Sequence, residues 1–319
     1  MGEREFNHGN IKGLYNTLKD VKQGTVISIK KSKRSTAKPK ALNTVEMLKI
    51  ASSKLGMGPH LAMQCAERLY TQGYISYPRT ETNQYPKNFD LMESLHIQTA
   101  SSTWGQDVSE LIRNGITPPK AGHDAGDHPP ITSMRCANFN EIMGDAWRLY
   151  EYITRHFIAT LAPDMVHEVT SVVVDINGQR FNTTCSNVIE PGYTKFLQRS
   201  SSTLSEQSIP SSLREGDKVL ISEVKINNHW TQPPGYLTES ELISLMEKHG
   251  IGTDASIPTH INNICLRNYV TIAAGRTLVP TKLGIMLVHG YQKIDNELVS
   301  SNIRSDLEKE LDRIAKGQL

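Results

Sequence analysis

Apolar residues recur at helical spacing in several separate stretches of the chain. Between residues 59 and 72, Leu61, Cys65 and Leu69 follow one another four residues apart, a proline opens the stretch and Gly73 follows it. Proline suits a first helical position and glycine suits the position just after a helix, so we predict a helix over 59–72. Capping residues or similar periodicity predict further helices at 11–18, 43–54, within 89–114, 141–160, 238–250, from about 255 to 267, and from 303 to the C-terminus.

Other stretches are rich in β-branched residues or alternate between apolar and polar positions. Such patterns predict strands over 25–29, 165–175, 180–184 and 219–225, with a turn at Gly178. Two short β-rich pieces, 269–272 and 277–279, read as a hairpin, and the serine-rich stretch 200–212 reads as a surface loop. The chain is therefore expected to mix helices with antiparallel strands.

A basic run separates the first predicted strand from the first long helix. Residues 30–40 hold six cations and no anion. Such a run is typical of a solvated, flexible connector, although a phosphate-binding strap, a hinge or a localisation signal fits it as well.

Composition places few limits on function. The 319 residues are 21% charged and 38% hydrophobic, as in ordinary globular proteins of two or three domains. The net charge of +2 means that any nucleic-acid surface must be a local patch. Four widely separated cysteines indicate neither a zinc knuckle nor a disulfide framework. No apolar run approaches the roughly 20 residues of a membrane helix, and no signal peptide is evident. We therefore expect the protein in the nucleus or cytosol and expect no contact with a membrane.

The segment 73–82 carries the first candidate chemistry. Pro78 disfavours a helical conformation for the residue before it, so Tyr77 is expected in an extended strand, with Arg79 on the same side and Ser76 on the other. A free phenol has a pKa of about 10 and needs nearby positive charge to act as a nucleophile. The same charge would stabilise a phosphoryl-transfer transition state. The alternative is a structural tyrosine packed in the core.

A second candidate site lies at residues 123–131. Two histidines and two aspartates fall within six residues there, in front of two prolines. Their spacing matches no standard metal site. Taken alone, His128 reads as a turn histidine bonded to Asp124 or Asp127.

The third candidate is a polar stripe on the predicted helix after Asp254, which could cap that helix. The side chains of Ser256, His260, Asn263 and Arg267 fall at i, i+4, i+7 and i+11. The stripe would be about 16 Å long, enough to follow a few nucleotides of single strand. A solvated helix face is the alternative.

These motifs carry a family resemblance. Residues 66–83 resemble the active-site segment of type IA DNA topoisomerases, and residues 39–48 and 250–258 resemble the beta form of the topoisomerase III branch. The resemblance covers nearly the whole chain in the family's order. It implies a multidomain α+β protein in which a mostly helical tyrosine-bearing cap domain, an antiparallel β arch and a helical winged-helix-like domain enclose a central hole. The segments implied are residues 1–40 and 164–230 for the arch, 41–163 for the helical domain and 231–319 for a truncated winged-helix-like domain.

The resemblance also assigns roles to the candidates. Tyr77 would cleave and religate one strand through a 5′-phosphotyrosine, with Arg79 and His128 stabilising charge, while Ser256 and Arg267 position the strand. Glu67, which stands where bacterial relatives carry glutamine, is a further candidate for contact with nucleic acid. Three other candidates complete this group: Ser76, His260 and Asn263.

The implied activity is the relaxation of negatively supercoiled DNA or decatenation, on DNA or RNA strands, without a nucleotide cofactor. Mg²⁺ would be held by a toprim domain, for which we find no segment, so a fragment is expected and no metal ligand is assigned in this chain. A Tudor-domain protein is the implied partner. Two alternatives stay open: a single-strand-binding clamp without catalysis and a purely architectural protein.

Overall fold

The computed structural model describes residues 8–119, 122–197, 209–210 and 212–318. The chain forms two compact units, and it enters each of them twice. Unit 1 combines residues 1–38 with 163–233, and unit 2 combines 39–162 with 234–319. The two segments predicted for the β arch thus share one unit, and the helical and winged-helix-like segments share the other. The finer division into domains stays a prediction.

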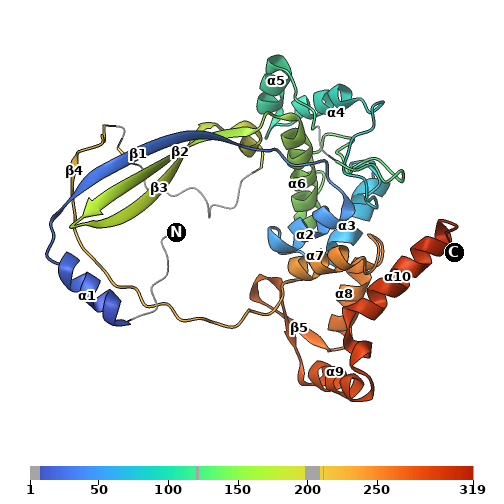
Figure 1. Cartoon of the computed structure of the whole chain (residues 1–319). Helices are drawn as coiled ribbons and strands as arrows, with labels where there is room; N and C mark the ends of the chain where they lie inside the picture. The colour runs from blue at the N-terminus through green and yellow to red at the C-terminus, as the bar shows by residue number, and fades with distance from the viewer. Residues whose placement is uncertain (1–7, 120–121, 198–208, 211, 319) are drawn as a thin grey trace. The chain divides into compact units, whose positions relative to one another are not determined.

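Unit 1 is built on a curled antiparallel sheet (Figure 1). Its strands are β1 (Gln23–Thr36), β2 (Met165–Ile176), β3 (Gln179–Glu190) and β4 (Lys218–Leu220), in the spatial order β3-β2-β1-β4. Helix α1 (His8–Leu18) precedes β1, and a 3-10 turn, η2 (Gly192–Lys195), follows β3. A bulge between Val26 and Ser28 interrupts the pairing of β1 with β2.

Residues 30–36 of the basic run are part of the sheet, which corrects the prediction of a flexible connector or hinge for them. Strand β1 continues to Thr36, and Lys31 and Arg34 pair with Thr170 and His167 of β2. The local pattern missed this strand because its partner lies more than a hundred residues away. Strand β4 is also shorter than predicted, and most of the serine-rich stretch lies outside the described residues.

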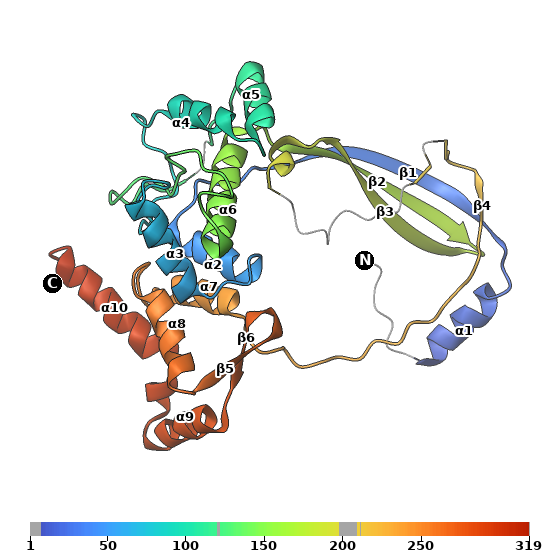
Figure 2. The same cartoon turned by 180° about the vertical axis from the view of Figure 1, so that it is seen from behind.

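Unit 2 is mainly helical and carries one small hairpin (Figure 2). Its core includes the buried side chains of Trp104, Tyr150 and Phe157. The elements are α2 (Thr44–Ser53), α3 (Pro59–Thr71), α4 (Leu91–Ile97), η1 (Gln98–Ala100), α5 (Gly105–Asn114), α6 (Gly144–Leu161), α7 (Glu239–His249), α8 (Ile257–Leu266), β5 (Val270–Ala273), η4 (Ala274–Arg276), β6 (Thr277–Pro280), α9 (Lys282–Ile294), η5 (Asn296–Val299) and α10 (Ser301–Ala315).

The predicted helix ends are largely confirmed. Asn43 accepts the backbone N–H of Glu46 at 3.0 Å and so caps α2. Thr238 and Glu241 form a complete capping box at the start of α7, which ends at Gly250 with φ +62°.

Two details of the helices were predicted wrongly. Leu61 is 43% exposed, because α3 buries a neighbouring stripe that includes Ala62, Ala66 and Leu69. Asp254 does not cap α8: its carboxylate accepts the N–H of Ala255, and the helix begins after Ser256. The predicted closing helix is present as α10, but its four apolar residues are all exposed: Ile303, Leu307, Leu311 and Ile314.

A buried ion pair joins three elements of unit 2. The carboxylate of Glu239, on α7, is 1% exposed and accepts two hydrogen bonds of 2.8 Å from Arg276 at the hairpin. It also accepts the hydroxyl of Ser52, on α2, at 3.1 Å. The hairpin, α7 and α2 are therefore fastened at one carboxylate.

We predict that Arg276→Met destabilises unit 2 by about 3 kcal/mol, because it leaves Glu239 buried without its counter-charge. Urea unfolding at neutral pH measures the change. Lys309→Met, which breaks an exposed pair with Asp306, is the control and should cost less than about 1 kcal/mol. Equal losses in the two variants would contradict the prediction.

Candidate active site

The segment that carries Tyr77 follows α3 directly and lies against residues 130–134. Gly73 ends α3 with φ +76°. Ile75 forms one antiparallel bridge with Ser133, and Ser76 donates its N–H to the carbonyl of Thr132 at 2.9 Å. The pairing goes no further, so the predicted strand is reduced to a single bridge. Pro78 has no N–H with which to extend a ladder.

Ser76 fastens these two segments together. Its hydroxyl donates to the carbonyl of Pro130 and accepts the N–H of Thr132, both at 2.9 Å. The hydroxyl predicted to contact nucleic acid is thus already engaged within the protein.

The ring of Tyr77 lies between two other rings. Its centroid is 5.2 Å from that of Tyr70 and 4.6 Å from that of His128, and both contacts are edge-on. Tyr77 is only partly buried, and its hydroxyl has no hydrogen-bond partner among the residues that the structure describes. A buried tyrosine such as Tyr150 differs, because its hydroxyl donates to Arg135 and accepts from Ala137. The ring of Tyr77 is thus held by two neighbouring rings, while within the described part of the chain its hydroxyl is not engaged as that of Tyr150 is.

His128 is held in place through its neighbour Asp127. The Asp127 carboxylate accepts the hydroxyl of Thr82 at 2.6 Å, the N–H of Glu81 at 2.7 Å and the hydroxyl of Thr80 at 3.1 Å. Burial opposes the charged form, but hydrogen bonds outweigh it and lower the pKa of Asp127 to about 2. The His128 ring packs on Tyr77 rather than on the side chain of Asp124 or Asp127.

Arg79 is held by Glu67, which lies on α3. Its Nε donates to Glu67 Oε1 at 3.1 Å, and its Nη2 contacts the same oxygen. This hydrogen bonding raises the pKa of Arg79, and the charge of Asp254, in the loop before α8, acts in the same direction. Both side chains of the pair are partly exposed, so the guanidinium is reachable from solvent. Glu67 is therefore part of the site because it accepts a hydrogen bond from Arg79.

The predicted polar stripe lies on α8 and its two caps. Ser256 is the residue before the helix, and its hydroxyl accepts the N–H of Thr253 at 2.9 Å. His260 and Arg267 are exposed, and Asn263 is half-buried. Three of the four side chains are thus open to a ligand, whereas the Ser256 hydroxyl is used in the turn.

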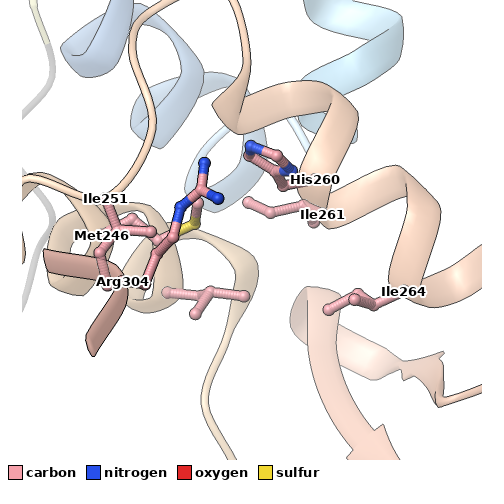
Figure 3. A pocket seen from close by; sticks show the side chains of 7 residues that line it. Met246, Ile251, His260, Ile261, Ile264 and Arg304 are labelled. Carbon is pink, nitrogen blue, oxygen red and sulfur yellow. The ribbon is translucent and has the colours of Figure 1, made fainter. Parts of the chain in front are cut away.

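A pocket of about 400 Å³ opens beside this stripe. Figure 3 shows the guanidinium of Arg304 and the ring of His260 on one side of it, above apolar side chains that include Met246 and Ile264. A polar rim over an apolar wall suits a planar ring.

The described part of the chain contains no group of three or more histidine, cysteine, aspartate or glutamate side chains placed to hold a metal ion. Within the same part, no helix is long and apolar enough to cross a membrane.

Comparison with known proteins decides the family. The family model described as DNA topoisomerase matches residues 2–319. The chain belongs to the type IA DNA topoisomerase family. It is 55% identical over 315 residues to DNA topoisomerase 3-beta-1 of Mus musculus, and 51% identical over 304 residues to DNA topoisomerase 3-beta of Drosophila melanogaster. These matches cover 99% and 95% of this chain but 36% and 34% of the relatives. The chain therefore spans about a third of their length.

A solved structure supports the fold of this topoisomerase chain. Full-length topoisomerase I from Thermotoga maritima matches it with a TM-score of 0.79 at 23% identity, over 99% of this chain and 52% of that one. The predicted mixture of helices with a curled antiparallel sheet is confirmed at this level.

Sequence reasoning missed the residues that hold the site together. Tyr70 lies on an exposed side of α3, one residue after the apolar stripe, and nothing in its spacing signals contact with Tyr77. Thr80 and Thr82 alternate along the segment and both donate to Asp127. The alternation of the two threonines was the one sequence signal that pointed to a shared hydrogen-bond partner.

We predict that Asp127→Asn removes part of the acid sensitivity of unit 2. The pKa of Asp127 in the folded chain is about 2, below its ordinary value of 3.8. The stabilisation is therefore fully present above about pH 4 and is lost as the pH falls through about 2. Thermal unfolding at pH 5 and pH 2.5 measures it: the wild type should lose more stability between the two than the variant. Asp124→Asn, which affects one hydrogen bond to Gly126, should behave like the wild type. Identical losses in all three would contradict the prediction.

Proposed function

We propose that this chain is the strand-cleaving core of a type IA topoisomerase. The Tyr77 hydroxyl attacks a phosphodiester in a single strand, a Tyr77 O–P bond forms, and the P–O bond to the 3′ oxygen breaks. The 3′ oxygen takes up a proton, and the phenol loses one. The 5′ end stays on Tyr77 until the 3′ hydroxyl attacks in reverse. One observation carries this proposal: Tyr77 is held between two rings, and no residue that the structure describes bonds its hydroxyl.

Arg79 and His128 serve as the charge-stabilising groups. A guanidinium donates strong hydrogen bonds to phosphate oxygens, and its positive charge stabilises the negative charge that develops on them during phosphoryl transfer. His128 is in ring contact with Tyr77, so a phosphate attacked by Tyr77 comes within reach of the imidazole. Glu67 accepts hydrogen bonds from Arg79 when no strand is bound. A phosphate that binds Arg79 therefore competes with this carboxylate for the guanidinium.

Helix α8 supplies the path for the strand. His260, Asn263 and Arg267 present donors or a ring along one side, and the pocket beside His260 is large enough for a base to enter. Ser256 helps to form this path indirectly, because its hydroxyl closes the turn before α8. These contacts suit single-stranded DNA or RNA, because none of them reads the sugar.

Several wider features are proposed from the family resemblance. They are a central hole enclosed by the cap, arch and winged-helix-like domains, relaxation or decatenation of DNA, magnesium bound by residues outside this chain, a Tudor-domain partner, and residence in the nucleus or cytoplasm. Magnesium would supply positive charge near the phosphate. A second candidate function is a clamp that binds a strand without cleaving it, and the formation of a covalent adduct distinguishes the two.

We predict that the chain forms a covalent adduct with a 3′-end-labelled single strand in the presence of magnesium. A 5′-phosphotyrosine leaves the label on the protein, so denaturing electrophoresis shows a shifted band. Tyr77→Phe should abolish this band and keep salt-sensitive binding of the strand. Tyr70→Phe, the matched control, should retain it.

A band that survives Tyr77→Phe would overturn the proposed mechanism. Binding without any band, in the wild type as in Tyr77→Phe, would favour the clamp.

We predict that Glu67→Gln tightens binding of a single strand about five- to tenfold. Removing the carboxylate that competes for Arg79 is worth about 1 kcal/mol or slightly more. Fluorescence anisotropy with a labelled oligonucleotide measures the change. Glu310→Gln removes an ion-paired carboxylate from α10 and controls for net charge. Equal effects of the two substitutions would contradict a competition at Arg79.

A further inference from the structure

The sheet of unit 1 has two chemically different faces. Side chains of a strand alternate between the faces, and residues directly opposite each other on neighbouring strands share one face. The register of β1, β2 and β3 therefore assigns each side chain of the basic run to a face.

One face gathers cations and hydroxyls. Lys30, Ser32 and Arg34 lie on it from β1. Their partners along the register are Ser171, Val169 and His167 on β2, and Thr184, Ser186 and Val188 on β3. These nine positions, which we call the cationic face, include no acidic and no large aromatic residue, and all of them are partly or fully exposed.

The opposite face carries one carboxylate beside its two lysines and is partly covered. Lys31 and Lys33 lie on it, with Glu168 directly opposite Lys33. Lys31 Nζ is 3.9 Å from the Glu168 carboxylate, which agrees with this assignment. Two central residues of this face, Thr170 and Val172, are buried. The cationic face, in contrast, is open, and neither Lys30 nor Arg34 has an ion-pair partner among the described residues.

We infer that the cationic face binds the sugar–phosphate backbone of a nucleic acid. Lys30 and Arg34 are four residues apart, about 13 Å along an extended strand, which spans about four phosphates on one strand of a duplex. The hydroxyls between them can donate to phosphate oxygens. Protein partners are usually anchored by large aromatic side chains, which this face does not present.

This inference deepens the proposed function, on which it rests, because it gives the enzyme a second nucleic-acid contact. Tyr77 lies in unit 2, whereas the cationic face lies in unit 1. Backbone contacts carry no sequence information, so this contact is independent of sequence and sensitive to salt.

Two double variants on the same strand test the inference. Lys30→Ala with Arg34→Ala removes two cations from the cationic face, and Lys31→Ala with Lys33→Ala removes two from the opposite face. Anisotropy of a labelled duplex, and separately of a single strand, is measured over a range of salt concentrations. The first variant should lower the slope of log affinity against log salt by up to about 1.8 for duplex or 1.4 for single strand. The second should change it by less than half as much.

Equal changes in the two double variants, or none in either, would overturn the inference. The covalent adduct at Tyr77 is measured in the wild type and in the variant with Lys31→Ala and Lys33→Ala, and it should form in both. If the adduct is missing even in the wild type while the salt slopes differ as expected, the proposed cleavage fails and the binding face stands. Matching circular dichroism spectra show that both variants are folded.

Discussion

The carboxylate of Asp127 is the interaction on which the candidate site most depends. Tyr77 and His128 lie on two segments that form neither helix nor strand, and backbone pairing between these segments is limited to the single bridge of Ile75 with Ser133. Three donors from residues 80–82 converge on this one carboxylate. Because Thr80 also donates to the carbonyl of His128 at 2.8 Å, the two chain segments are tied at adjacent residues. The contact between the two rings follows from that tie.

Electrostatics then prepares the site for an anion. Arg79 is charged and partly exposed, and in the absence of a strand Glu67 satisfies it. A partly exposed ion pair of this kind contributes little to stability, so exchanging the carboxylate for a phosphate costs little. The site can thus keep a guanidinium near Tyr77 without burying an unpaired charge.

The sequence predicted most helices well, because their signals are local. Asn43, Thr238 and Gly250 act at the helix ends where they stand. The strand through the basic run was missed because it depends on pairing with β2, far along the chain. Likewise, proline before Arg79 correctly excluded a helix, but the extent of the bridge at Ile75 depends on residues near 133.

The candidate site was predicted unevenly for the same reason. The resemblance named Tyr77 and His128, and the structure brings their rings together. No spacing in the sequence links Tyr70 to that pair or Glu67 to Arg79, since both contacts depend on how α3 lies against the segment that follows it. The hydroxyls of Ser76 and Ser256 looked available in the sequence, but turns and loops of the folded chain use them.

Mapping the covalent bond by mass spectrometry tests the central claim most directly. Trypsin cuts after Arg68 and Arg79, and the peptide between them carries three tyrosines: Tyr70, Tyr74 and Tyr77. After the trapped strand is trimmed by a nuclease, fragmentation of this peptide shows which tyrosine holds the nucleotide. We expect the added mass of the nucleotide on Tyr77 alone. A nucleotide on Tyr70, on Tyr74 or on any other peptide would contradict it.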